Sequence, residues 1–263
     1  MTRNMYPWWQ RTAMAVAVGI ATLAAAPAAL AGTGVTLDFD TVAPGFLYNG
    51  TQFEHQGVLL SSYSNDPEGL PEDTVGAIFD GNDASTCMGL SCPTNNFTPG
   101  YYAGLNDGVL VIDAPRAGGL QVKSFDASFI GAFPGSGAEF PGVAGVLEMR
   151  GYGADGQYQV ERFNLGGPLG NEFFMQRYDT SASFANTSFA EIVLFAYRCD
   201  YSGTCSAFET NGGQFALDNV ALTVTAVPEP SAWLTLFGGL GLLGATLRRR
   251  RLAFRATSTN VAA

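Results

Sequence analysis

The sequence predicts an all-β domain, a β-sandwich or jelly roll, between an N-terminal signal peptide and a single C-terminal transmembrane helix. Three observations predict this arrangement. Short segments in the middle of the chain alternate apolar and polar residues, which is the period of a half-buried strand. Glycine, proline, asparagine and aspartate cluster between these segments. An apolar run lies near each end of the chain, outside the alternating pattern.

Residues 1–31 have the composition of a secretory signal peptide. Arg3 and Arg11 give a basic start, residues 13–30 are apolar and rich in alanine, and a small-x-small site allows cleavage after Ala31. The two arginines are not adjacent, so we expect the Sec route and not a twin-arginine route. The alternative is an uncleaved N-terminal anchor.

Residues 32–226 are expected to form one exported domain. Residues 35–40 alternate and predict its first strand. Asp155-Gly156 predicts the turn of a hairpin over residues 152–159, because positive φ costs little there. Long loops are expected from 65 to about 98 and from 166 to about 189. Further strands are expected at residues 57–62, 109–112, 120–125, 146–150, 158–163, 192–197 and 215–225.

The predicted domain is strongly acidic. It contains six basic residues and 22 acidic ones. This balance excludes nucleic acid and anionic lipid headgroups as expected partners, since both require a basic surface. It is compatible with divalent cations and with neutral polysaccharide. The alternative is that the charge serves solubility alone.

The four cysteines lie in two close pairs, Cys87 with Cys92 and Cys199 with Cys205. An even number in an exported domain predicts two disulfides. Pairing within each cluster would close small loops and add modest stability. A zinc site is the competing interpretation, but such sites favour two-residue spacings or several histidines, and His55 is the only histidine.

Motifs for catalysis are largely absent. No supporting motif surrounds His55, which we expect to be a surface or structural residue, and Ser136 lacks the glycine spacing of a nucleophile elbow. Residues 80–85 begin like an EF-hand loop but lack its later ligands, and predict a solvated turn. We therefore expect a non-catalytic protein. A secreted glycan hydrolase that uses carboxylates stays open as an alternative, although no spacing singles out a pair.

Aromatic side chains are the remaining candidates for ligand contact. Tyr101 and Tyr102 fall in or beside predicted loops, as do Phe46, Tyr48 and Tyr201, and sugar rings can stack on exposed aromatic rings. If the segment is extended, Tyr101 and Tyr102 point to opposite faces, so at most one of them lines a given groove.

The C-terminal region has three parts in a fixed order. Pro228, Glu229 and Pro230 precede an uncharged apolar run over residues 231–247, which is at the short end for a membrane-spanning helix. A basic cluster follows and predicts a cytoplasmic end for the helix and a cytoplasmic tail over 252–263. The cluster consists of Arg248, Arg249, Arg250 and Arg251. Residues 227–251 resemble the PEP-CTERM sorting signal of Gram-negative bacteria.

This resemblance implies how the protein is processed and where it is localised. Exosortases, which are membrane transpeptidases, read such signals, so an exosortase is the implied processing partner. The cytoplasmic (inner) membrane would hold the protein only transiently. The implied destination is the cell surface or an extracellular matrix, in association with exopolysaccharide or a biofilm. A structural surface protein without a small ligand is a further alternative.

Both ends of the domain resemble galactose-binding-like jelly rolls. Residues 37–40, 48–50 and 56–58 are similar to the start of that fold. Residues 214–220 are similar to its last strand, and to a group of PEP-CTERM proteins with a Gln-Phe-x-x-Asp motif. In carbohydrate-binding jelly rolls, acidic residues on the first and last strands often hold a structural calcium.

The resemblance therefore implies Asp40 and Asp218 as ligands of a structural calcium ion. Calcium takes six to eight oxygen ligands, many of them carboxylates and carbonyls. The first and last strands of such a fold can lie side by side, which would bring the two carboxylates together. The alternative is that Asp218-Asn219 forms a turn or bulge and that Asp40 faces water.

Overall fold

The computed structural model describes residues 32–93, 99–114, 117–132, 138–226 and 240. The chain divides into two compact units, of which Ala31–Ala226 contains the β-structure. The predicted signal peptide lies outside the described residues, and so do the predicted transmembrane run (apart from Leu240), the arginine cluster and the tail. Within the described part, no helix is long and apolar enough to cross a membrane.

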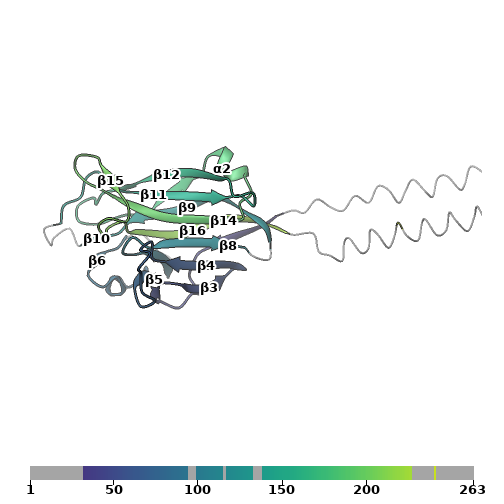
Figure 1. Ribbon diagram of the computed structural model, residues 1–263. Helices are drawn as coiled ribbons and strands as arrows, with labels where there is room; N and C mark the ends of the chain where they lie inside the picture. Colours follow the sequence, from purple (N-terminus) through teal and green to yellow (C-terminus); the bar gives the residue numbers. More distant parts are fainter. Residues whose placement is uncertain (1–31, 94–98, 115–116, 133–137, 227–239, 241–263) are drawn as a thin grey trace, which may run out of the picture. The chain divides into compact units, whose positions relative to one another are not determined.

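Two antiparallel sheets of seven strands form the domain, which confirms the predicted all-β fold and the β-sandwich (Figure 1). Sheet A has the order β13-β9-β16-β7-β5-β2, with β1 also paired to β16. Its strands are β1 (Thr33–Leu37), β2 (Gly45–Tyr48), β5 (Thr74–Asp80), β7 (Gly100–Gly104), β9 (Ala117–Phe129), β13 (Gln176–Asp179) and β16 (Phe215–Ala226).

Sheet B has the order β12-β11-β14-β8-β4-β3, with β15 also paired to β14. Its strands are β3 (Thr51–His55), β4 (Val58–Tyr63), β8 (Val109–Asp113), β11 (Val143–Tyr152), β12 (Tyr158–Gly166), β14 (Glu191–Cys199) and β15 (Cys205–Ser206). The smaller elements are β6 (Leu90–Ser91), β10 (Gly131–Ala132), the 3-10 helix η2 (Ala84–Cys87) and α2 (Ala182–Asn186).

The main core lies between the two sheets. Alternating side chains of each strand point inward, because successive residues of a strand face opposite sides. Each buried aliphatic side chain contributes about 1.5–3 kcal/mol relative to exposure. Representative members of this core are Leu120, Val122, Leu217 and Leu222 of sheet A and Leu60, Leu110, Ile112, Leu147 and Leu194 of sheet B.

The first and last strands pair, as expected from the jelly-roll resemblance. β1 runs antiparallel to β16, with Leu37 opposite Val220. The predicted first strand over 35–40 is too long, because Phe39 has a φ of 55° and the backbone N–H of Val42 donates to the Phe39 carbonyl at 3.0 Å. Asp40 therefore lies in a turn after β1.

The predicted hairpin is present between β11 and β12. Tyr152 pairs with Tyr158, and the N–H of Gly153 donates to the carbonyl of Gln157 at 2.8 Å. Gly156 has a φ of 78°, a conformation that glycine adopts without steric cost. Asp155 Oδ1 accepts a hydrogen bond from the N–H of Gln157 at 3.1 Å, which fixes the turn.

The two predicted long loops contain regular structure. The first contains β5, and the second contains β13 and α2. The prediction of a continuous loop over 65–98 is wrong because both faces of β5 are buried, so that the strand shows no alternation. The expected turn after Asp80 is present, since the N–H of Asp83 donates to the Asp80 carbonyl at 3.0 Å.

A second apolar cluster covers the outer face of sheet A. The segment with η2 and β6 supplies part of its cover through Cys87 and Leu90. The buried members of the cluster are Ala77, Phe79, Cys87, Tyr101, Ala103, Leu105, Ile130, Met175 and Ala216. Sheet A is therefore packed on both faces at β5 and β7.

Candidate functional site

The two predicted disulfides are confirmed. Cys87 bonds to Cys92, and Cys199 bonds to Cys205. The first disulfide lies in the cover of the second apolar cluster. The second joins the facing ends of β14 and β15, where Cys199 and Cys205 are register partners. Each disulfide thus closes a short loop.

Tyr101 and Tyr102 are not exposed in a loop, so that expectation is wrong. Both lie in β7, between β16 and β5, and both are buried. As expected for an extended segment, they point to opposite faces: Tyr102 enters the main core, and the Tyr101 hydroxyl lies 3.4 Å from Cys87 Sγ. Burial raises the pKa of both hydroxyls. Neither ring offers a surface for a ligand to stack on.

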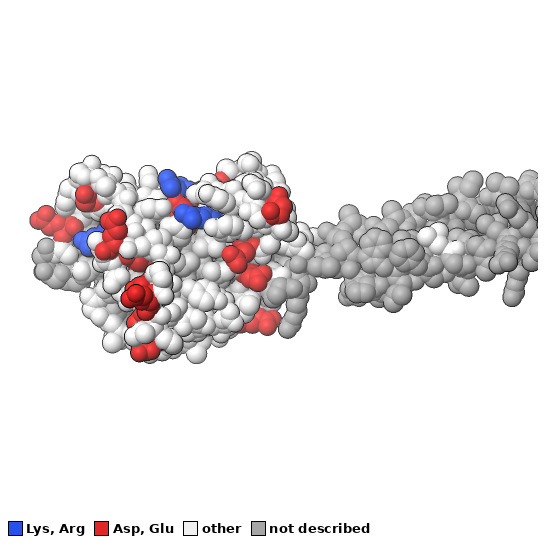
Figure 2. Space-filling view, in the orientation of Figure 1, with Lys and Arg blue, Asp and Glu red and all other residues white. Residues whose placement is uncertain are grey.

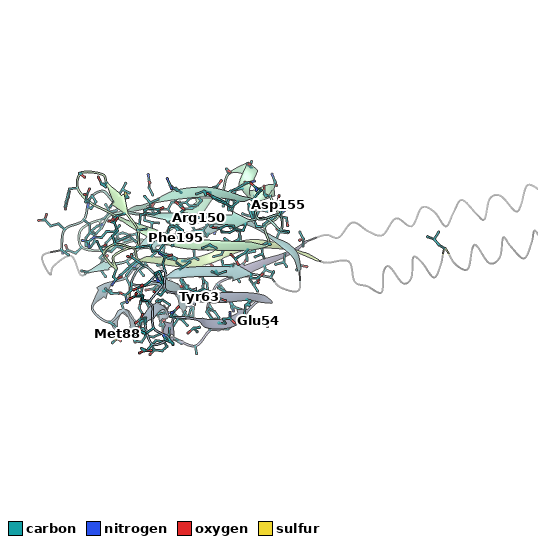
Figure 3. All side chains as sticks on the ribbon, viewed as in Figure 1. Glu54, Tyr63, Met88, Arg150, Asp155 and Phe195 are labelled. Carbon is teal, nitrogen blue, oxygen red and sulfur yellow. A yellow bond between two sulfur atoms is a disulfide. The ribbon has the colours of Figure 1, made fainter. Side chains whose placement is uncertain are left out.

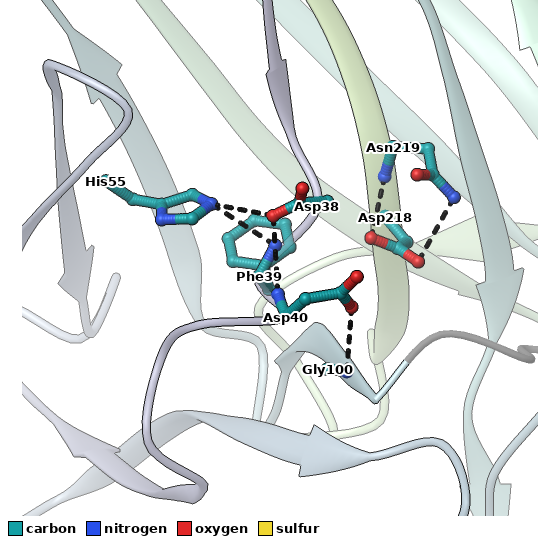
Figure 4. Close-up of polar contacts among 7 residues, drawn as sticks. All are labelled: Asp38, Phe39, Asp40, His55, Gly100, Asp218 and Asn219. Atoms are coloured by element: carbon teal, nitrogen blue, oxygen red, sulfur yellow. Dashed lines mark hydrogen bonds and ion pairs between the residues drawn. The ribbon is translucent and has the colours of Figure 1, made fainter.

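Asp40 and Asp218 lie in the same region of sheet A (Figure 4). Asp40 Oδ1 accepts a hydrogen bond from the N–H of Gly100, at the start of β7, at 3.2 Å. Asp218 lies in β16, is 0% exposed, and is the register partner of Asp126 in β9. Since β7 and β9 flank β16, three neighbouring strands position these carboxylates.

A bulge in β16 determines the polar contacts of Asp218. Asn219 has a φ of 49°, and the register with β9 shifts after Asp218. The backbone N–H of Asn219 donates to Asp218 Oδ1 at 2.7 Å. Its side-chain amide donates to Asp218 Oδ2 at 3.2 Å and to Asp126 Oδ2 at 3.0 Å. The bulge predicted as the alternative to calcium is therefore present.

Calcium prefers carboxylate and carbonyl oxygens as ligands, and Asp40 and Asp218 each offer a carboxylate. The described residues contain no group of three or more His, Cys, Asp or Glu side chains that could hold a metal ion. Calcium binding by Asp40 and Asp218 stays a prediction.

His55 has a structural role at the end of β3. It is buried, its ring stacks on Phe39 at 5.7 Å, and its Nε2 lies 3.2 Å from Asp38 Oδ1. The backbone N–H of Phe39 donates to the same Nε2 at 3.3 Å. These contacts fix the turn that carries Asp40.

An ionic cluster lies on the outer face of sheet B. Its centre is Glu148 of β11, which is 0% exposed. Arg150 Nε donates to Oε1 at 2.6 Å, Arg162 Nε donates to Oε2 at 2.7 Å, and the Tyr197 hydroxyl donates to Oε2 at 3.0 Å. Burial would raise the pKa of Glu148, but these hydrogen bonds together outweigh it and lower the pKa.

Aromatic rings support the guanidinium groups of this cluster. Arg150 lies 4.9 Å from the Phe195 ring centre, and Arg162 lies 5.7 Å from that of Tyr197. Figure 3 labels Arg150 and Phe195. Basic side chains are sparse on the face shown in Figure 2, and acidic side chains are scattered over it.

Sequence reasoning missed the ionic cluster, although a signal was available. The hairpin turn at Asp155-Gly156 fixes the register of β11 and β12, which makes Glu148 the partner of Arg162. The position of Tyr197 on the neighbouring strand β14 could not be found in this way, because β11 and β14 are distant in sequence.

A cleft of about 320 Å³ lies beside the second disulfide. We name it the Tyr201 cleft. Its wall is the loop from Cys199 to Cys205, and its floor includes Val146 of β11 and Asn164 of β12. Tyr201 is 66% exposed, and its hydroxyl donates to the Phe140 carbonyl at 3.1 Å. The sequence named Tyr201 among the aromatics beside loops, but not the cleft.

Several solved structures are similar to this chain. A DUF4465 family protein from Bacteroides ovatus has 9% identity and a TM-score of 0.38, over 73% of this chain and 98% of that chain. TmCBM61 in complex with β-1,4-galactotriose has 10% identity and a TM-score of 0.31, over 65% and 90%. The CBM22-2 xylan-binding domain from Paenibacillus barcinonensis Xyn10C has 13% identity and a TM-score of 0.31, over 73% and 99%.

Comparison with curated proteins gives no match. A family model for the PEP-CTERM protein-sorting motif matches residues 226–251. These residues contain Pro228, Glu229 and Pro230, the apolar run and the arginine cluster, as the resemblance predicted. The chain therefore carries a PEP-CTERM protein-sorting motif at its C-terminal side.

Proposed function

We propose that the β-sandwich is an exported, non-catalytic domain that associates with exopolysaccharide at the cell surface or in the extracellular matrix. The PEP-CTERM motif is the observation that carries this proposal, because it implies export, membrane anchoring and processing by an exosortase. After processing, the domain leaves the inner membrane of its Gram-negative host.

Two properties of the domain support an extracellular role. All four cysteines form disulfides, which persist in oxidising compartments. The strong excess of acidic residues keeps a secreted protein soluble and repels polyanions. A neutral polysaccharide is therefore the partner that the charge favours.

Cell fractionation tests the processing step. Replacing Pro228, Glu229 and Pro230 together by alanine is expected to retain the full-length protein in the membrane fraction, whereas the wild type appears shortened at the surface or in the medium. The exposed substitution Glu209→Ala is the matched control and is expected to behave as wild type. Equal shortening of the triple variant would contradict processing at this motif.

Cosedimentation tests the polysaccharide association. The processed protein recovered from its host is mixed with isolated exopolysaccharide and with cellulose as an unrelated glucan. Retention by the exopolysaccharide, without release of reducing ends, is the expected result. An absence of retention would contradict the association and favour a structural surface protein without a glycan ligand.

One observation favours glycan hydrolysis as a second candidate. Glu191 of β14 is the register partner of Asp113 in β8, and burial and the Asp113 charge raise the pKa of Glu191. Glycoside hydrolysis uses an acid of raised pKa near a second carboxylate. Reducing-end release that disappears in Glu191→Gln would support it.

A structural calcium ion at Asp40 and Asp218 is part of the proposal. Register places the fully buried carboxylate of Asp218 opposite Asp126, and a cation there would reduce repulsion between like charges. Asp40 Oδ1 and Asp218 would supply ligands, and calcium would stabilise the junction of β1, β7 and β16. The melting temperature in calcium and in chelator tests this.

A further inference from the structure

The Tyr201 cleft is built on rigid elements. The disulfide between Cys199 and Cys205 closes the loop that carries Tyr201. Inside the loop, the Asp200 N–H donates to the Thr204 carbonyl at 2.9 Å, and Asp200 Oδ1 accepts from the Thr204 N–H at 2.9 Å. The Tyr201 hydroxyl donates a hydrogen bond to the Phe140 carbonyl. The ring is thus held in place before any ligand arrives, which lowers the entropy cost of binding.

The floor of the cleft faces away from the main core. Val146 and Asn164 are register partners on β11 and β12, and the neighbouring residue Leu147 points into the core. Asn164 is exposed, on the outer face of β12. It offers two donors and an acceptor to a ligand.

The ionic cluster borders the same floor. Arg162 lies two residues before Asn164 on β12, and residues two apart share a face of a strand. Tyr197 is the β14 partner of Val146. Arg162 uses Nε for Glu148, and its side chain is 63% exposed. Its guanidinium therefore has further donors on the face of β12 that Asn164 shares.

The charges around the cleft are of both signs. Glu148 pairs with both Arg150 and Arg162, so the ionic cluster keeps one net positive charge. The Asp200 carboxylate accepts from the Ser202 hydroxyl and the Thr204 N–H, and these bonds lower its pKa, so that it stays charged. With the acidic domain around it, the cleft favours a ligand that is neutral and rich in hydroxyl groups.

We infer that the Tyr201 cleft binds one neutral sugar unit of a polysaccharide, with the sugar ring stacked on Tyr201 and its hydroxyl groups bonded to Asn164 and Arg162. The volume of about 320 Å³ is at the small end for ligand pockets, as a single ring requires. An exposed aromatic ring beside a few polar groups suits the apolar face and polar edge of a sugar ring. The inference rests on the proposed association with exopolysaccharide.

Affinity electrophoresis of the processed full protein tests the cleft. The probes are the neutral oligosaccharides released by mild acid from the host exopolysaccharide, and polyglucuronate as a charged counterpart. Tyr201→Ala is expected to weaken binding of the neutral probe about five- to tenfold, from the loss of one ring contact. Tyr201→Trp is expected to retain it, and Asn164→Ala to weaken it a few fold.

Tyr158→Ala is the matched control, because Tyr158 is another exposed tyrosine, 58% exposed, at the start of β12 and six residues before Asn164. It is expected to bind as wild type. Replacing Cys199 and Cys205 together by serine is expected to weaken binding by releasing the loop. Thermal melts of each variant separate loss of binding from loss of folding.

The outcomes distinguish the cleft from the wider proposal. If folded Tyr201→Ala binds the neutral probe as tightly as the wild type does, sugar binding at the Tyr201 cleft is contradicted. The exopolysaccharide association would then stand. Tighter binding of polyglucuronate than of the neutral probe would contradict the inference that the ligand is neutral. A wild-type protein that binds neither its exopolysaccharide nor the probes would overturn both proposals.

Discussion

Replacing Glu148 by glutamine tests how the outer face of sheet B is stabilised. Glu148 is buried and accepts hydrogen bonds from Arg150, Arg162 and Tyr197. Glutamine keeps the shape but places an amide donor against guanidinium donors. Removing one partner of a buried ion pair costs about 3–5 kcal/mol. Because Arg162 is largely exposed and can be hydrated, we expect a smaller loss than this, about 2 kcal/mol, after screening.

Urea unfolding at pH 7 measures this loss, and a thermal melt should shift down by roughly 4–8 °C for a domain of this size. The lowered pKa of Glu148 means that its stabilisation is complete above its ordinary pKa of 4.5 and is lost as the pH falls through the lower folded value. The difference between wild type and Glu148→Gln should therefore shrink in acid.

Glu209→Gln, the same change at an exposed position, is the control and should cost nothing measurable. A loss below about 0.5 kcal/mol at pH 7 for Glu148→Gln would refute the reasoning. So would a difference that stays constant from pH 7 down to pH 3, because the ionised carboxylate would then not be its source.

Three further predictions concern stability. Asp107→Ala removes the acceptor of the Gly213 and Asn211 N–H groups, at 2.5 and 2.9 Å, and should lower the free energy of unfolding by about 2 kcal/mol in urea titration. Gly156→Ala forces a side chain into positive φ and should cost about 1 kcal/mol, whereas Gly142→Ala, which meets no atom within 4 Å, should not. Calcium at 100 times its dissociation constant should add about 2.7 kcal/mol, and identical melts in calcium and chelator would contradict the site.

Local patterns predicted much of the fold. Alternation located β8, β11 and β12, and the Asp155-Gly156 turn gave the hairpin with its register. Cysteine spacing gave both disulfides. The strands β5 and β7 were missed because they are buried on both faces, so that their sequences lack a period of two.

The candidate site was less predictable for a physical reason. The Tyr201 cleft and the contact of Tyr197 with Glu148 depend on the pairing of β11 with β14, which are far apart in the chain. No local pattern encodes that pairing. Tyr101 and Tyr102 were misplaced for the same reason, since the pairing of β7 with β16 and β5 makes it a central strand.

The position of β16 determines how the domain would carry tension. This 12-residue strand pairs with β9 along one edge and with β7 and β1 along the other. A pull on its C-terminal end runs along the strand axis and perpendicular to the ladder hydrogen bonds. These bonds would share the load and break together, in shear. If the domain is attached at its sorting end, flow past the cell would therefore load the hydrogen bonds on both edges of β16 in shear.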